Sequence, residues 1–169
     1  MHTTLLGLAF LVVMPGAPPA RPDTPRKPSP FAPSLPELTD EEEDRLDRVI
    51  DRFIDFDTGK LPGEEGKKAF QEFKDLGPEA TFALIRGLNK AAKIEGSCPA
   101  VTIAKKLSGI LSKTKDTQLL DFARENVGAG VEKSRHMNVI KDLRVNCTLR
   151  KNALEASGTV VRPYGDPPE

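Results

Sequence analysis

The stretch LGPEATFALIRGL, residues 76–88, contains the end of one predicted helix and the start of the next. Gly77 favours a helix C-terminus, and Pro78 suits the first turn of a helix, where its missing N–H needs no partner. Apolar residues at positions 82, 84, 85 and 88 then recur at helical spacing. This pattern predicts a helix from Pro78 to about Ala92 with one apolar face.

Two further helices are predicted on the N-terminal side of this stretch. Thr39 and Glu42 have the spacing of a capping box, and acidic residues crowd the first turn after them, where the helix dipole favours negative charge. That helix should end near Thr58–Gly59. A second helix follows Gly63 and ends before Gly77. The apolar positions of the two helices are Leu46, Val49, Ile50, Phe53, Ile54, Ala69, Phe70, Phe73 and Leu76.

On the C-terminal side, three more helices are predicted. The first starts at Pro99, and Asp116 caps the second, which ends at Gly128. The last runs from about Glu132 to Leu154. No segment alternates apolar and polar residues with a period of two, so no sheet is expected. The expected fold is all-α, with about six amphipathic helices packed as antiparallel pairs.

Residues 75–88 resemble the opening of a HEAT-type helical repeat, in which a turn with Gly and Pro or Asp leads into an A-x-x-A-L-x-x-x-L helix. The chain is also similar to small exported HEAT-like proteins of planctomycete-type bacteria. A solenoid needs about three stacked repeats, and the LGPEA motif occurs once, so the resemblance implies a HEAT-like helical bundle. Because HEAT-like proteins generally bind other proteins, it also implies a binding role without chemistry.

Both ends of the chain read as non-globular. The apolar run from Leu5 to Val13 is shorter than the ~20 residues that span a bilayer, and its length fits a signal peptide. We predict a signal peptide over residues 1–20 with cleavage after Ala20, although no Lys or Arg precedes the run; an uncleaved anchor is the alternative. A Pro-rich linker over 21–37, the helical domain over 38–154 and a loose tail over 155–169 follow.

The charges balance at 25 basic and 25 acidic residues, which argues against a nucleic-acid partner. They are unevenly placed, however. Residues 39–57 hold nine acids and three bases, and residues 132–151 hold six bases and two acids. Charge runs usually form solvated helix faces. The alternatives are that these two helices lie close together or that one of them docks a charged partner.

Cys98 and Cys147 are the two cysteines, and in an exported protein they predict a disulfide. The alternatives are two buried free thiols, or a reactive Cys98 whose pKa is lowered at a helix N-terminus. The single histidine after residue 20, His136, is eleven residues from Cys147 and thus ~16 Å away along a helix. We therefore predict no catalytic, cofactor-binding or metal-binding residues.

The sequence as a whole predicts an exported, non-enzymatic helical domain that works in the periplasm, at the cell envelope or outside the cell. Its partner would be another protein, held by a helix face or by the acidic first helix. Membrane contact is expected only through an uncleaved signal segment. Two alternatives remain at this point: a thiol-dependent enzyme that uses Cys98, and a structural spacer in an envelope assembly.

Overall fold

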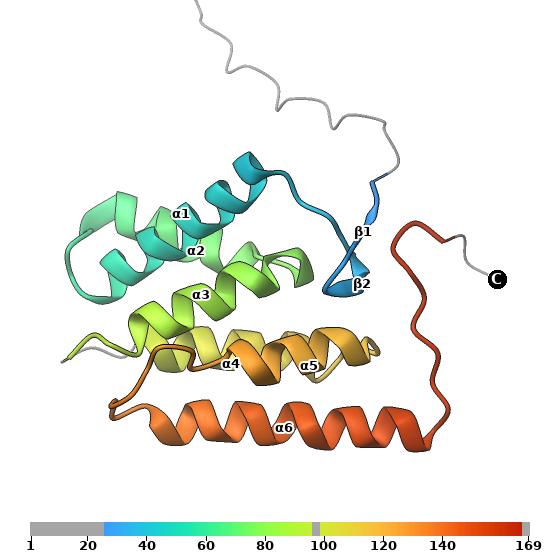
Figure 1. Cartoon of the computed structure of the whole chain (residues 1–169). Helices are drawn as coiled ribbons and strands as arrows, with labels where there is room; N and C mark the ends of the chain where they lie inside the picture. Colours follow the sequence, from blue (N-terminus) through green and yellow to red (C-terminus); the bar gives the residue numbers. More distant parts are fainter. Residues whose placement is uncertain (1–25, 96–98, 167–169) are drawn as a thin grey trace, which may run out of the picture.

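Six α-helices make up most of the computed structural model, which describes residues 26–95 and 99–166, and this confirms the all-α fold class (Figure 1). A short 3-10 turn, η1 (Pro78–Ala80), precedes the third helix. The helices are α1 (Asp40–Asp57), α2 (Gly63–Asp75), α3 (Thr81–Ala91), α4 (Pro99–Leu111), α5 (Thr117–Asn126) and α6 (Met137–Ala156).

Local sequence signals set several of these boundaries. Thr39 and Glu42 form both hydrogen bonds of the predicted capping box at the start of α1. Asp116 caps α5 by accepting hydrogen bonds from the backbone N–H groups of Gln118 and Leu119. The last helix begins at Met137, five residues later than predicted, because the loop before it packs against α3: the Ser134 hydroxyl donates to the Ala92 carbonyl at 2.6 Å.

Consecutive helices pack as antiparallel pairs, as predicted: α1 with α2, α3 with α4, and α5 with α6. The pairs are stacked, since α1 also packs on α3 and α4 on α6. In Figure 1 the stack runs from α1 and α2 to α6 along the opposite side. None of the helices in the described part of the chain is both long and apolar enough to cross a membrane.

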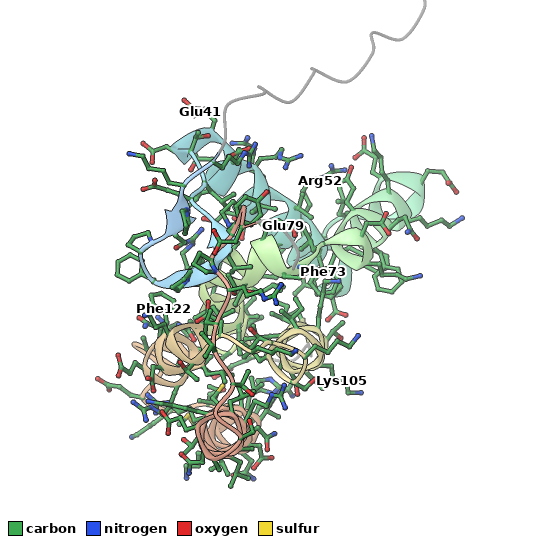
Figure 2. The ribbon with its side chains drawn as sticks, turned by 90° about the vertical axis from the view of Figure 1, so that its right-hand side faces the viewer. Glu41, Arg52, Phe73, Glu79, Lys105 and Phe122 are labelled. Atoms are coloured by element: carbon green, nitrogen blue, oxygen red, sulfur yellow. The ribbon has the colours of Figure 1, made fainter. Side chains whose placement is uncertain are left out.

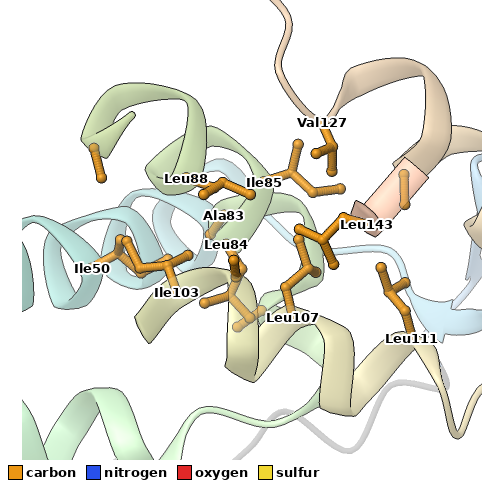
Figure 3. Close-up of a cluster of buried hydrophobic side chains, with 14 of the residues drawn as sticks. Ile50, Ala83, Leu84, Ile85, Leu88, Ile103, Leu107, Leu111, Val127 and Leu143 are labelled. Atoms are coloured by element: carbon orange, nitrogen blue, oxygen red, sulfur yellow. The ribbon is translucent and has the colours of Figure 1, made fainter. Parts of the chain in front are cut away.

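The core is centred on α3 (Figure 3). Leu84 and Leu88 of this helix have no exposed surface, and Ile50 of α1 and Ile103 of α4 pack around them. Gly87 faces the Ile50 side chain, which leaves no room for a Cβ atom at position 87. Close packing of α1 on α3 therefore depends on this glycine.

A β-hairpin corrects the expectation that the chain has no sheet. Strand β1 (Pro28–Ser29) pairs antiparallel with β2 (Ala32–Pro36), and Ala32 and Leu35 of β2 are buried in the core. This part of the predicted linker thus belongs to the domain. Prolines suit an edge position, where no N–H is needed, but they disguise the period of two by which a strand is recognised. The predicted signal peptide and residues 21–25 of the linker lie outside the described residues.

Two long-range hydrogen bonds hold β2 in place. The Ser34 N–H donates to the Asp116 carboxylate at 2.9 Å, so the residue that caps α5 also anchors the hairpin. The Tyr164 N–H donates to the Pro33 carbonyl at 2.7 Å. The segment after α6, expected to be a loose tail, therefore contacts the hairpin at this point.

Candidate functional site

Three phenylalanine rings lie in a row where the hairpin meets α3 and α5. Phe31 comes from the turn between β1 and β2, Phe82 from α3 and Phe122 from α5; we call these three residues the phenyl row. The ring centroids of Phe31 and Phe122 are 5.5 Å apart, and those of Phe82 and Phe122 are 4.9 Å apart in an edge-to-face arrangement. Both geometries are favourable for aromatic pairs.

Phe31 is the most exposed aromatic side chain of the described residues, with 59% of its surface accessible. Single exposed apolar residues are common on protein surfaces and need no explanation. Phe31 differs because its ring contacts the ring of Phe122, which in turn contacts the ring of Phe82, and both of these residues are partly buried against the core. The three rings form a continuous aromatic surface, and two of them pack against the hydrophobic core.

A surface hollow of about 320 Å³ lies beside the phenyl row. The hairpin, the segment before α1, α1 itself, α3 and α5 all contribute to its walls, so the hollow exists only when the hairpin is docked. Figure 2 shows Phe122 on α5 just below the hairpin, on the side of the molecule away from α2. The lining residues of this phenyl hollow are Ser29, Pro30, Phe31, Pro36, Glu37, Leu38, Glu43, Phe82, Arg86 and Phe122.

The rim of the phenyl hollow is acidic. Arg86 is its one basic lining residue, and this guanidinium pairs with Glu43 at 3.1 Å and with Asp47 at 3.1 Å. Two carboxylates thus face one cation, and Glu37 adds a further negative charge. The neighbouring Glu42 also stays ionised, because the hydrogen bond from the Thr39 backbone N–H, together with Arg26, lowers the pKa of its carboxyl.

The acidic run over residues 39–57 is largely neutralised by neighbouring elements. Figure 1 shows α1 and α6 on opposite sides of the molecule with α3 and α4 between them, so the alternative in which the two charged helices lie together is wrong. The acids of α1 instead pair with basic residues of the loop after α1, of α3 and of the chain before β1. These ion pairs are Glu42 with Arg26, Glu43 and Asp47 with Arg86, Asp51 with Lys90, and Asp55 with Lys60.

The basic run over residues 132–151 also has partners inside the molecule. Arg144 donates to the Arg124 carbonyl at the C-terminal end of α5, where the helix dipole favours a cation. Arg150 donates twice to the Thr114 carbonyl in the loop before α5. The side chain of Lys151 pairs with Asp121 at 2.6 Å. These bases hold α6 against α5, which leaves less charge for a partner than the sequence suggests.

Cys147 lies in the core, with 3% of its surface exposed, and burial raises the pKa of its thiol to about 11. A thiol held neutral in this way is a poor nucleophile. Its neighbours include Leu111 and Ser112, around a second, smaller hollow of about 220 Å³.

Cys98 lies outside the described residues, so the predicted disulfide and the predicted reactive thiol both stay predictions. It directly precedes Pro99 at the N-terminal end of the 13-residue helix α4, whereas Leu111 and Ser112 are at the other end. A disulfide would therefore require the chain before Pro99 to reach α6 across much of the ~18 Å length of that helix.

His136 is not among the residues that line the hollow at Cys147. His136 is the N-cap residue of α6, has 5% of its surface exposed and accepts a hydrogen bond from Arg135 at 3.2 Å. Within residues 26–95 and 99–166, no three His, Cys, Asp or Glu side chains lie close enough to share a metal ion.

The sequence did not identify the phenyl hollow. Position 82 was expected on the apolar face of its helix, and Phe31 lies in the predicted linker over residues 21–37. The available signal was FAPSL, residues 31–35, in which apolar residues interrupt a Pro-rich segment.

No family model, no curated protein and no solved structure matches this chain. The resemblance of residues 75–88 to a HEAT-type repeat accordingly stays a prediction. The phenyl hollow is the surface feature from which we infer a function.

Proposed function

We propose that this protein is an exported, non-enzymatic helical domain that binds another protein through the phenyl hollow. The observation that carries this proposal is Phe31, an aromatic side chain that is 59% exposed beside a hollow of about 320 Å³. Exposed aromatic residues seated on packed neighbours are typical of the few positions that supply most of the binding energy in a protein interface. The proposal of export rests on residues 1–20 of the sequence.

The surroundings of the hollow favour binding over chemistry. Its floor is aromatic, and two of its three charged groups, Glu43 and Arg86, form an ion pair with each other. The thiol of Cys147 is buried elsewhere. An aromatic floor with a polar rim is the arrangement found at the centre of protein interfaces.

A site-specific crosslink tests this function. A photoreactive phenylalanine analogue is placed at position 31, and as the matched control at position 70, where Phe70 of α2 is also exposed but lies away from the hairpin. We expect one discrete adduct from position 31 in the protein's own cells and none from position 70. The purified adduct partner should then bind Phe31→Ala about tenfold or more weaker than the unchanged protein, the loss typical of a truncated aromatic hot spot.

Equal crosslinking from both positions would contradict the proposal, as would unchanged affinity of the partner for Phe31→Ala. Circular dichroism of each variant shows whether the helical fold is intact. Since Phe31 is mostly exposed, its replacement is expected to leave the fold unchanged.

A further inference from the structure

The phenyl hollow lies beside negative charge that the protein does not neutralise. Residues 37–47 hold seven acids and one base, Arg45. Arg26 and Arg86 reach this segment from other elements and pair with three of the acids. Even with Lys27 of the chain before β1, the acids outnumber the bases. The acids of this segment that form no ion pair with any residue the structure describes are Glu37, Asp40, Glu41 and Asp44.

Two of these unpaired acids lie on the side of α1 that faces the phenyl hollow. Asp40, Asp44 and Asp47 follow one another at intervals of four and three residues, so they share one side of the helix. Asp47 pairs with Arg86, which lines the hollow, and this contact identifies the side. Figure 2 shows the start of α1, marked by Glu41, next to the hairpin. The exposed side chains of Asp40 and Asp44 therefore extend the acidic rim along α1.

An exposed aromatic side chain beside unpaired carboxylates selects the chemistry of a ligand. Phe31 and Glu37 both line the hollow, and both are exposed. An apolar side chain of a partner is buried favourably against the rings. A Lys or Arg next to it pairs with the carboxylates, and its aliphatic stem or its cation contacts an aromatic face. Complementary charge at the rim of an interface sets specificity and the rate of association, and like charge excludes the wrong partner.

We propose that the occupant of the phenyl hollow is a basic segment of another protein, which inserts an apolar side chain between the rings and the hairpin. Its flanking Lys or Arg residues lie over Glu37, Asp40 and Asp44. This inference rests on the proposed function, because it states the chemistry of the partner that the same hollow binds. An acidic segment would bring further negative charge against these carboxylates and is excluded.

Selection from a phage-displayed library of random twelve-residue peptides tests the inference on the purified protein. Peptides that also bind Phe31→Ala are removed first, so that those retained require the phenyl row. We expect the retained peptides to combine at least two Lys or Arg residues with a proline, aliphatic or aromatic residue. A synthetic copy of the most frequent peptide should bind the double variant Asp40→Asn, Asp44→Asn about three- to tenfold more weakly than the unchanged protein, as the loss of two exposed ion pairs implies.

The matched control neutralises two other exposed acids, Glu132 in the loop before α6 and Asp142 on α6, the helix on the opposite side of the molecule from α1. The variant Glu132→Gln, Asp142→Asn should bind the peptide as the unchanged protein does. Added salt should weaken binding to the unchanged protein more than binding to Asp40→Asn, Asp44→Asn, because salt screens the charges that this variant lacks. Circular dichroism of both double variants checks that the helical fold is intact.

Three results would overturn the inference. Retained peptides with no excess of Lys and Arg would show that the hollow does not select basic segments. Equal affinity of the peptide for the unchanged protein and for Asp40→Asn, Asp44→Asn would show that these acids take no part. A library that yields no peptide dependent on Phe31 would show that the hollow does not hold a short segment. In each case a discrete crosslink from position 31 to another protein would still support the proposed function, so the two proposals can fail separately.

Discussion

Replacing Gly87 by alanine tests the packing of α1 on α3 most directly. Gly87 lies within α3, and a Cβ atom at this position would overlap the Cγ2 methyl of Ile50 on α1. Ile50 is 1% exposed and surrounded by the core, so it has little space into which to move. The backbones of the two helices can approach this closely only because position 87 has no side chain.

Two opposing effects set the magnitude. Overpacking of a filled core costs ~1–3 kcal/mol, whereas alanine is about 1 kcal/mol better than glycine in a helix interior. The matched control is Gly109→Ala in α4, where nothing lies within 4 Å of the added atom, so this variant gains the helix preference alone. The free energy of unfolding of Gly87→Ala should therefore be ~1–3 kcal/mol below that of Gly109→Ala.

Urea unfolding followed by far-ultraviolet circular dichroism measures this difference. Ile50→Leu supplies a second test because it removes the branched methyl at Cβ while conserving volume. In that background the cost of Gly87→Ala should shrink, with a coupling of ~0.5–3 kcal/mol between the two positions. Equal stability of the two alanine variants, or a cost that Ile50→Leu leaves unchanged, would refute the described contact between α1 and α3.

The other predictions concern three buried or capping groups, Asp116, Cys147 and Glu42. Asp116→Ala removes the carboxylate that caps α5 and that accepts the hydrogen bond from the Ser34 N–H. The free energy of unfolding, measured with urea, should therefore fall by about 2–4 kcal/mol. Asp116→Asn keeps one side-chain oxygen, so its free energy of unfolding should fall by less in the same assay. With its pKa raised to about 11 by burial, the Cys147 thiol should resist a thiol reagent at pH 8 in folded Cys98→Ser protein and react on unfolding. The thiol has a higher pKa in the folded state than in the unfolded state, so the free energy of unfolding should fall as pH rises from the ordinary thiol range of ~8.5 towards 11. Cys147→Ala lacks this thiol, and its free energy of unfolding should fall less over the same pH range. The pKa of the Glu42 carboxyl is lowered in the folded state, so its contribution to stability should be lost as pH falls below the ordinary glutamate range of ~4.3. In urea titrations at acid pH, the free energy of unfolding of Glu42→Gln should decline less steeply with falling pH than that of the unchanged protein.

Sequence reasoning succeeded where the signal is local. The capping box at Thr39 and Glu42 and the cap at Asp116 depend on residues within three positions of each other, and the structure confirms both. The apolar spacing in α3 predicted its buried face, apart from Phe82, which is only partly buried. These features need no knowledge of distant parts of the chain.

The errors occur where a distant partner decides the conformation. The last helix starts late because Ser134 bonds to the end of α3, 42 residues away in sequence. The hairpin is held by burial of Ala32 and Leu35 in the core and by the hydrogen bond from the Ser34 N–H to the carboxylate of Asp116. The phenyl hollow combines both effects, since Phe31 completes it only after the hairpin has docked.

The bond between Ser34 and Asp116 also imposes an order on folding, because it joins residues 82 positions apart. At a synthesis rate of ~5–20 residues per second, strand β2 waits at least ~4–16 seconds before α5 exists to receive it. An unpaired strand in that interval is a template for pairing with other chains. Prolines at positions 28, 30, 33 and 36 remove the N–H groups that such pairing requires. The same prolines that disguise the strand in the sequence therefore disfavour its pairing with other chains before α5 is available.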